Sequence, residues 1–76
     1  MELDVRGDIC PYPMMKAIEA MKHLKGDKVI KVITDHSPAL ETIPPQAQRL
    51  GFSVVIEDVA PAEWVITLRR EAEEKA

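Results

Sequence analysis

The spacing of the apolar residues changes several times along the chain, and this succession limits the possible folds more than any other feature. Apolar residues alternate in "ELDVR" (residues 2–6), which predicts a short strand with Leu3 and Val5 on one face. From Pro13 the spacing becomes three and four residues, which predicts an amphipathic helix that ends at Gly26. The apolar stripe of that helix consists of Met14, Ala17, Ile18, Met21 and Leu24. "KVIKVIT" (residues 28–34) is rich in β-branched residues and predicts a central strand.

The second helical region, "DHSPALETIPPQAQRLG" (residues 35–51), contains three prolines. Ser37 is a suitable N-cap, and Pro38 suits the first helical position, where its missing N–H costs nothing. Pro44 and Pro45 should interrupt the apolar stripe, because a proline inside a helix removes a hydrogen bond and clashes with the preceding turn. We therefore expect a broken element, with one turn from Pro38, a second start at Pro44 or Pro45, and an end at Gly51. The expected stripe consists of Leu40, Ile43, Ala47 and Leu50.

The last third of the chain predicts a β-hairpin. "FSVVIEDV" (52–59) and "EWVITLRR" (63–70) both alternate, "APA" between them is a turn, and the charged residues 71–76 should form a frayed tail. The whole order is β-α-β-α-β-β, and right-handed crossovers place both helices on one face of the sheet. The prediction is one domain over residues 1–76, an α/β (α+β) two-layer sandwich with a four-stranded mixed sheet.

Composition narrows the chemistry. The chain has one cysteine, so an internal disulfide or a cysteine-rich zinc site is excluded, and we expect no metal and no cofactor. A lone reduced thiol indicates the cytoplasm, the N-terminus has no signal-peptide pattern, and no apolar run reaches the length of a membrane helix. The net charge of −3 disfavours a direct nucleic-acid partner, since phosphate binding requires a basic surface.

The single cysteine, Cys10, stands directly before "PYP" (residues 11–13) at the predicted helix start. A helix N-terminus favours the thiolate, and Pro11 and Pro13 should stiffen the loop that presents it. With no N–H on either proline, the amides of Tyr12 and Met14 should face the sulfur. The alternative is that Cys10 is a buried packing residue, as free cysteines often are.

Few reactions suit one activated cysteine. Acyl transfer needs a base, for which His36 is better placed than His23, and a dithiol cycle needs a second cysteine, which is absent. Accepting a sulfane sulfur as a persulfide and passing it on needs one sulfur only.

Three neighbouring residues are candidates for contact with a partner or with the sulfur anion. Tyr12 is next but one to Cys10, Met15 lies off the main apolar stripe, and Arg6 could favour a persulfide anion by its positive charge. The alternative is that Met15 belongs to the core edge and that Arg6 is simply solvated.

The chain resembles the TusA/SirA-like family of sulfur carriers over nearly its whole length. The resemblance lies in "LDVRG" before the cysteine, "CPYP" at the start of a methionine-rich helix, "GD" before the second strand, the acidic Asp35, and "IP" at residues 43–44. It implies the same β-α-β-α-β-β fold and a sulfurtransferase-like carrier that holds sulfur as a persulfide on Cys10. A nucleic-acid-binding or regulatory interaction module with a structural Cys10 is the alternative.

The resemblance also implies the kinds of partner. Family members act in tRNA thiolation, molybdenum-cofactor assembly and thiosulfate or sulfur metabolism, and their partners are sulfur-donor and sulfur-acceptor proteins. Those partners would include a cysteine desulfurase, a rhodanese, a thiolation enzyme or a thiosulfate transporter. Tyr12 stands where the tRNA-thiolation member has glutamate, and an aromatic residue there resembles the YeeD-like branch, which is linked to thiosulfate uptake.

Overall fold

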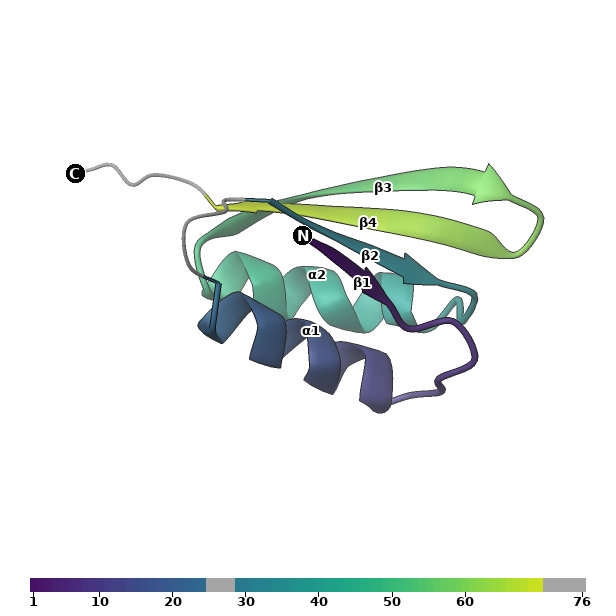
Figure 1. The fold of residues 1–76 in the computed structure, drawn as a ribbon, viewed down its shortest axis with the longest axis horizontal. Coiled ribbons are helices and arrows are strands. Elements are labelled where there is room, and N and C mark those ends of the chain that lie inside the picture. The colour runs from purple at the N-terminus through teal and green to yellow at the C-terminus, as the bar shows by residue number, and fades with distance from the viewer. Residues whose placement is uncertain (25–28, 71–76) are drawn as a thin grey trace.

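The computed structural model describes residues 1–24 and 29–70. The elements in chain order are β1 (Glu2–Asp4), α1 (Tyr12–Lys22), β2 (Val29–Thr34), α2 (Ala39–Arg49), β3 (Phe52–Ala60) and β4 (Glu63–Arg70) (Figure 1). The predicted helix stop at Gly26, the start of the second strand at Lys28 and the tail at 71–76 lie outside the described residues.

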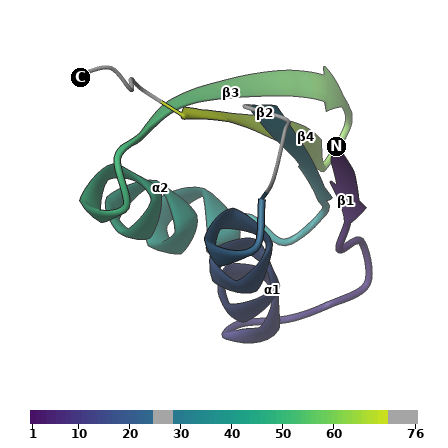
Figure 2. The ribbon, with the colours of Figure 1, turned by 60° about the vertical axis from the view of Figure 1, so that its left-hand side comes forward.

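The strands form one mixed sheet in the order β1-β2-β4-β3. β1 pairs with β2 in parallel, whereas β4 pairs antiparallel with both β2 and β3. Both helices cover the same face of this sheet, and the other face is open (Figures 1 and 2). The predicted two-layer sandwich, the central second strand and the terminal hairpin are therefore confirmed.

The core is almost entirely aliphatic, as expected for a small chain without a disulfide. β2 and β4 supply most of its sheet side, and Phe52 is its one aromatic member among the described residues. The fully buried side chains include Ala17, Ile30, Val32, Ile43, Ala47, Ile66 and Leu68. None of the helices in the described part of the chain is long and apolar enough to span a membrane.

The second helix corrects the sequence-based expectation, because α2 runs without a break through Pro44 and Pro45. The two missing N–H groups leave the carbonyls of Leu40 and Glu41, four residues earlier, without their usual helical donors. Glu41 is exposed and Leu40 half-buried, while Ala39, Ile43 and Ala47 are fully buried against the sheet. Packing of that apolar face outweighs the local proline penalty.

The start of α2 also differs from the prediction. Pro38, not Ser37, is the N-cap, and no side chain caps this helix. The first amides are satisfied by backbone instead, since Ala39 N–H donates to the His36 carbonyl and Leu40 N–H to the Ser37 carbonyl, both at 2.9 Å. The predicted end is correct, because Gly51 follows the helix with φ +87°, a conformation suited to glycine.

Candidate functional site

Cys10 lies in the connection between β1 and α1 and is exposed to solvent. It immediately precedes Pro11, the N-cap of α1, and the helix begins at Tyr12. The predicted place beside the N-cap is confirmed. The alternative, a buried packing cysteine, is wrong.

A backbone turn fixes the residues around the sulfur. Tyr12 N–H donates to the Ile9 carbonyl at 2.9 Å, and Met15 N–H donates to the Pro11 carbonyl at 3.0 Å. The expectation that the Tyr12 amide faces the sulfur is therefore wrong, because the turn already uses that donor. Within the described part of the chain no carbonyl accepts the Met14 N–H, so this amide remains available at the helix start.

Pro13 anchors this end of the helix. It is the second helical residue, and its side chain is fully buried. The N–H of the second residue of a helix has no acceptor within the helix. A proline at this position therefore packs its ring into the core without removing a helical hydrogen bond. Pro11, by contrast, is exposed.

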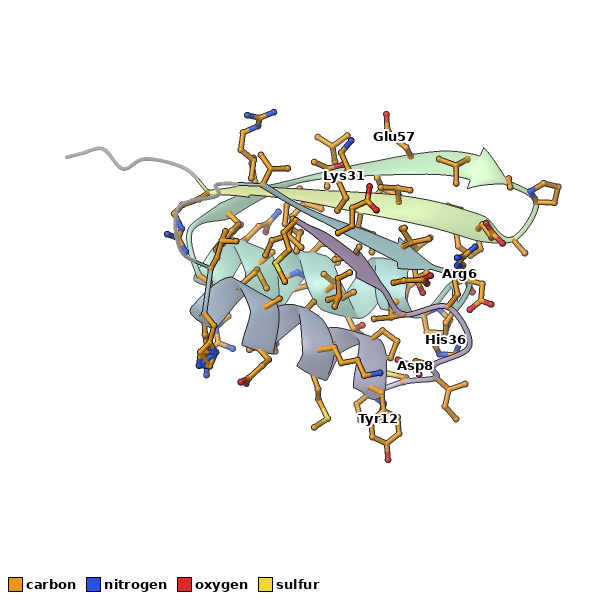
Figure 3. All side chains as sticks on the ribbon, in the orientation of Figure 1. Arg6, Asp8, Tyr12, Lys31, His36 and Glu57 are labelled. Atoms are coloured by element: carbon orange, nitrogen blue, oxygen red, sulfur yellow. The ribbon has the colours of Figure 1, made fainter. Side chains whose placement is uncertain are left out.

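The loops after the two parallel strands meet at one edge of the sheet, as the fold predicts. Gly7 N–H donates to Asp35 Oδ1 at 3.0 Å, with Gly7 at φ +88°. His36 lies next to this junction (Figure 3), and its own N–H donates to Thr34 Oγ1. No hydrogen bond joins His36 to Cys10 among residues 1–24 and 29–70, so the geometry shows no preformed cysteine–histidine pair.

Arg6 is held by carboxylates. Its Nε donates to Asp4 Oδ1 at 2.9 Å and its Nη2 to Asp4 Oδ2 at 2.7 Å, while Nη1 is 3.9 Å from a Glu63 oxygen. The Arg6 side chain, together with its backbone N–H, lowers the pKa of Asp4 to about 2, and Asp4 raises the pKa of Arg6 in return. A role for Arg6 beside a persulfide anion stays a prediction.

A second ion pair links the cysteine loop to the helix. Lys16 Nζ lies 2.6 Å from Asp8 Oδ2, and Asp8 is the more buried partner. Asp8 is two residues before Cys10, and Lys16 is one turn beyond Tyr12. This bridge therefore restrains the cysteine loop from the side of α1.

Exposed apolar side chains surround the start of α1. Ile9 is 62%, Tyr12 55% and Met15 53% exposed, and Tyr12 points away from the sheet (Figure 3). The interpretation of Met15 as lying off the buried stripe is confirmed, and contact of Tyr12 and Met15 with a partner stays a prediction. We name Ile9, Tyr12 and Met15 the apolar collar.

Comparison with known proteins identifies the family. A family model described as "Sulfurtransferase TusA" matches residues 1–70. The chain belongs to the TusA family. One relative, a candidate sulfur carrier protein of Thermotoga maritima, is 37% identical over 68 residues, which cover 88% of this chain and 86% of that protein. Another, from Methanocaldococcus jannaschii, is 35% identical over 69 residues, with 91% and 92% covered.

The solved structures agree on the fold of this TusA-family chain. A SirA-like protein from Desulfitobacterium hafniense superposes with a TM-score of 0.80, covering 90% of this chain and 93% of that one. At 20% sequence identity the likeness supports the fold alone.

Another relative, the candidate sulfur carrier YedF of Escherichia coli, is 36% identical over 53 residues, which cover 70% of this chain and 69% of YedF.

Sequence reasoning missed several residues that shape the site of this TusA-family member. Ile9 is part of the apolar collar, and Asp8 and Lys16 form the bridge behind the cysteine. The Asp4–Arg6 pair could have been inferred, because an aspartate two residues before an arginine can bond both its side chain and its backbone N–H. The Asp8–Lys16 pair spans a turn and a helix start, and no local pattern indicates it.

Proposed function

We propose that this protein is a sulfur carrier that accepts a sulfane sulfur as a persulfide on Cys10 and passes it to a partner protein. The observation that carries the proposal is the exposed Cys10 at the start of α1 in a chain of the TusA family. Relatives named as candidate sulfur carriers support the same role.

The proposed loading step is a nucleophilic exchange at sulfur. The Cys10 thiolate attacks the terminal sulfur of a donor persulfide, a new S–S bond forms, and the donor's own thiolate leaves with the electron pair of the broken bond. With thiosulfate as donor, sulfite would be the leaving group. Neither reaction needs an external oxidant or reductant, because the sulfane sulfur is transferred at its existing oxidation level.

The unloading step reverses these roles. An acceptor thiolate attacks the terminal sulfur on Cys10, and the Cys10 thiolate leaves. Cys10 reacts through its sulfur in both steps, as the nucleophile on loading and as the leaving group on release, and its exposure at the start of α1 leaves that sulfur open to both partners. The sequence has no second cysteine, so no disulfide within the chain can expel the sulfur before a partner arrives.

The partners we propose are a sulfur donor, such as a cysteine desulfurase or a rhodanese, and an acceptor in thiolation, molybdenum-cofactor or thiosulfate metabolism. The exposed apolar collar supports contact with proteins in preference to nucleic acid, since large exposed apolar residues are typical of protein interfaces. A reducing compartment such as the cytoplasm would keep the lone Cys10 thiol available.

Mass spectrometry of the intact protein tests the proposal. After incubation with a persulfide donor or with thiosulfate, the wild type should gain one sulfur atom, roughly 32 Da, which a reducing agent removes. Cys10→Ser should remain folded and gain nothing, and Ser37→Ala, at the start of the other helix, should load as the wild type does. An adduct on Cys10→Ser, or no adduct on the wild type with any of these donors, would overturn the proposal.

A further inference from the structure

A groove lies between the outer edge of β1 and the helix α1. Its volume is about 550 Å³. The lining is mostly apolar, with two charged side chains, and consists of Met1, Leu3, Tyr12, Met15, Lys16, Glu19 and Ala20. Tyr12 and Met15 belong to the apolar collar as well, so the groove begins beside the cysteine loop. Lys16 is paired with Asp8, and Glu19 lies 3.3 Å from the His23 ring, so both charged lining residues already have partners. The groove therefore suits apolar side chains.

The strand above this groove has an unpaired edge. Among the strands of residues 1–24 and 29–70, β1 is the first in the sheet order and pairs with β2 only. Lys31 N–H donates to the Met1 carbonyl and Val5 N–H to the Ile33 carbonyl, both at 2.9 Å, so the backbone groups of the odd-numbered residues face β2. By the two-residue period of a strand, the N–H and C=O groups of Glu2 and Asp4 face outwards.

Side chains along the same strand alternate between the two layers. Leu3 packs against the core on the helix side. Glu2 and Asp4 are exposed, and the two-residue period of a strand places both on the open face. The Asp4 carboxylate is paired with Arg6, but Glu2 forms no ion pair within residues 1–24 and 29–70. An added strand would therefore place every second side chain in the apolar groove and the others beside a carboxylate.

We propose that the edge of β1 binds an extended segment of a sulfur-donor or sulfur-acceptor protein by strand addition. The segment alternates large apolar residues, which enter the groove, with basic residues, one of which faces Glu2. Main-chain hydrogen bonds to Glu2 and Asp4 provide affinity, and the groove provides specificity. The bound segment would end beside Tyr12, two residues from Cys10. The identity of the partner as a sulfur donor or acceptor rests on the proposed carrier function.

A synthetic peptide provides the probe. It alternates valine and lysine over about eight residues, the length of an ordinary strand, and is blocked at both ends. In amide NMR spectra of the labelled protein, the shifts should concentrate on Glu2, Asp4, Tyr12 and Met15. A peptide N-methylated at the residues whose N–H groups face β1 should not bind, and a valine–glutamate peptide should bind about tenfold more weakly.

Two matched variants locate the site. Met15 and Val55 are both exposed and apolar, at 53% and 57%, but Val55 lies on β3 at the opposite edge of the sheet. Met15→Glu should weaken peptide binding by about tenfold or more, and Val55→Glu should leave it unchanged. Shifts that map to β3, or equal binding by both variants, would overturn the proposal, as would tight binding of the N-methylated peptide.

The docking proposal and the carrier function can fail separately. Cys10→Ser should bind the peptide as the wild type does, since the thiol is not part of the groove. If the wild type binds the peptide but gains no sulfur, the carrier function is wrong and strand addition stands. If it gains sulfur but does not bind the peptide, strand addition is wrong and the carrier function stands.

Discussion

Both helices of this protein have a proline at the N-cap, Pro11 in α1 and Pro38 in α2, but the prolines within their bounds occupy different places along the helix. Pro11 and Pro13 lie at the N-cap and in the first turn of α1, where the backbone N–H groups have no helical acceptor. Pro44 and Pro45 lie in the middle of α2, where two ladder hydrogen bonds are lost. The first set shapes the cysteine loop at no cost in hydrogen bonds, and the second set persists only because packing compensates.

The comparison assigns different roles to the two helices. α1 provides the site: its first turn carries Tyr12, Met15 and the available Met14 amide beside an exposed thiol. α2 lies next to α1 on the same face of the sheet (Figure 2). We infer that α2 supports the site as a scaffold. Substitutions in α2 should therefore change mainly the free energy of unfolding, and substitutions at the start of α1 should change mainly the rate at which Cys10 is loaded with sulfur.

The largest effect is expected from the core face of α2. Ile43 is fully buried, one residue before the proline pair. Ile43→Ala should lower the free energy of unfolding by about 3 kcal/mol, because it leaves a cavity and removes the packing that holds the helix across its prolines. Urea unfolding measures this change. Met15→Ala, at an exposed position of α1, is the control and should change stability by less than about 0.5 kcal/mol.

The proline pair of α2 should respond in the opposite direction. Replacing both Pro44 and Pro45 by Ala restores donors for the Leu40 and Glu41 carbonyls, and we expect a gain of about 2 kcal/mol in the free energy of unfolding. The gain is smaller than two full proline penalties of about 3 kcal/mol each for two reasons. The unfolded chain becomes freer by up to about 1 kcal/mol per proline, and replacing the half-buried ring of Pro44 removes packing worth about 1–2 kcal/mol. A loss of stability in the double variant would show that the rings contribute more through packing than the missing donors cost.

The pair at the start of α1 predicts a different result. Pro13→Ala removes buried ring atoms and should cost about 1–2 kcal/mol of stability, without unfolding the protein. Because the ring holds the cysteine loop in place, sulfur loading of Cys10 should slow by about tenfold. Loading is followed by intact mass against time, beside a thermal unfolding curve. Unchanged loading with reduced stability would mean that Pro13 is a packing residue only.

The contrast between the helices also explains what the sequence could predict. The strand and helix order, the aliphatic core and the place of Cys10 follow from periodicity and capping patterns, which are local. The continuity of α2 cannot be predicted in this way. Pro44 and Pro45 locally favour a break in the helix. The burial of its apolar face against a sheet formed largely by residues distant in sequence outweighs that local effect, and this face consists of Ala39, Ile43 and Ala47. The groove below β1 is likewise invisible to local patterns, since Leu3 and Met15 meet only after the crossover is made.

The smallest expected effect concerns the Asp4–Arg6 pair beside the cysteine loop. The Arg6 side chain lowers the pKa of Asp4 from 3.8 to about 2, so the pair stabilises the folded state above the unfolded pKa. That contribution should disappear as the pH falls through the folded value. Both side chains are about half exposed, at 47% and 49%, and solvent keeps the effect small. Asp4→Asn should therefore unfold at a slightly lower temperature than the wild type near neutral pH.

The difference between wild type and Asp4→Asn should shrink when the pH is lowered from about 5 to about 2, as Asp4 becomes protonated. Asp58→Asn, an exposed position with no ion pair among the described residues, is the matched control and should show no such convergence. A temperature difference that stays constant over this range would mean that the Asp4 carboxylate contributes nothing beyond its neutral hydrogen bonds. Convergence would show instead that Arg6 is held by a charged partner, and that any contact between Arg6 and a persulfide anion must compete with Asp4.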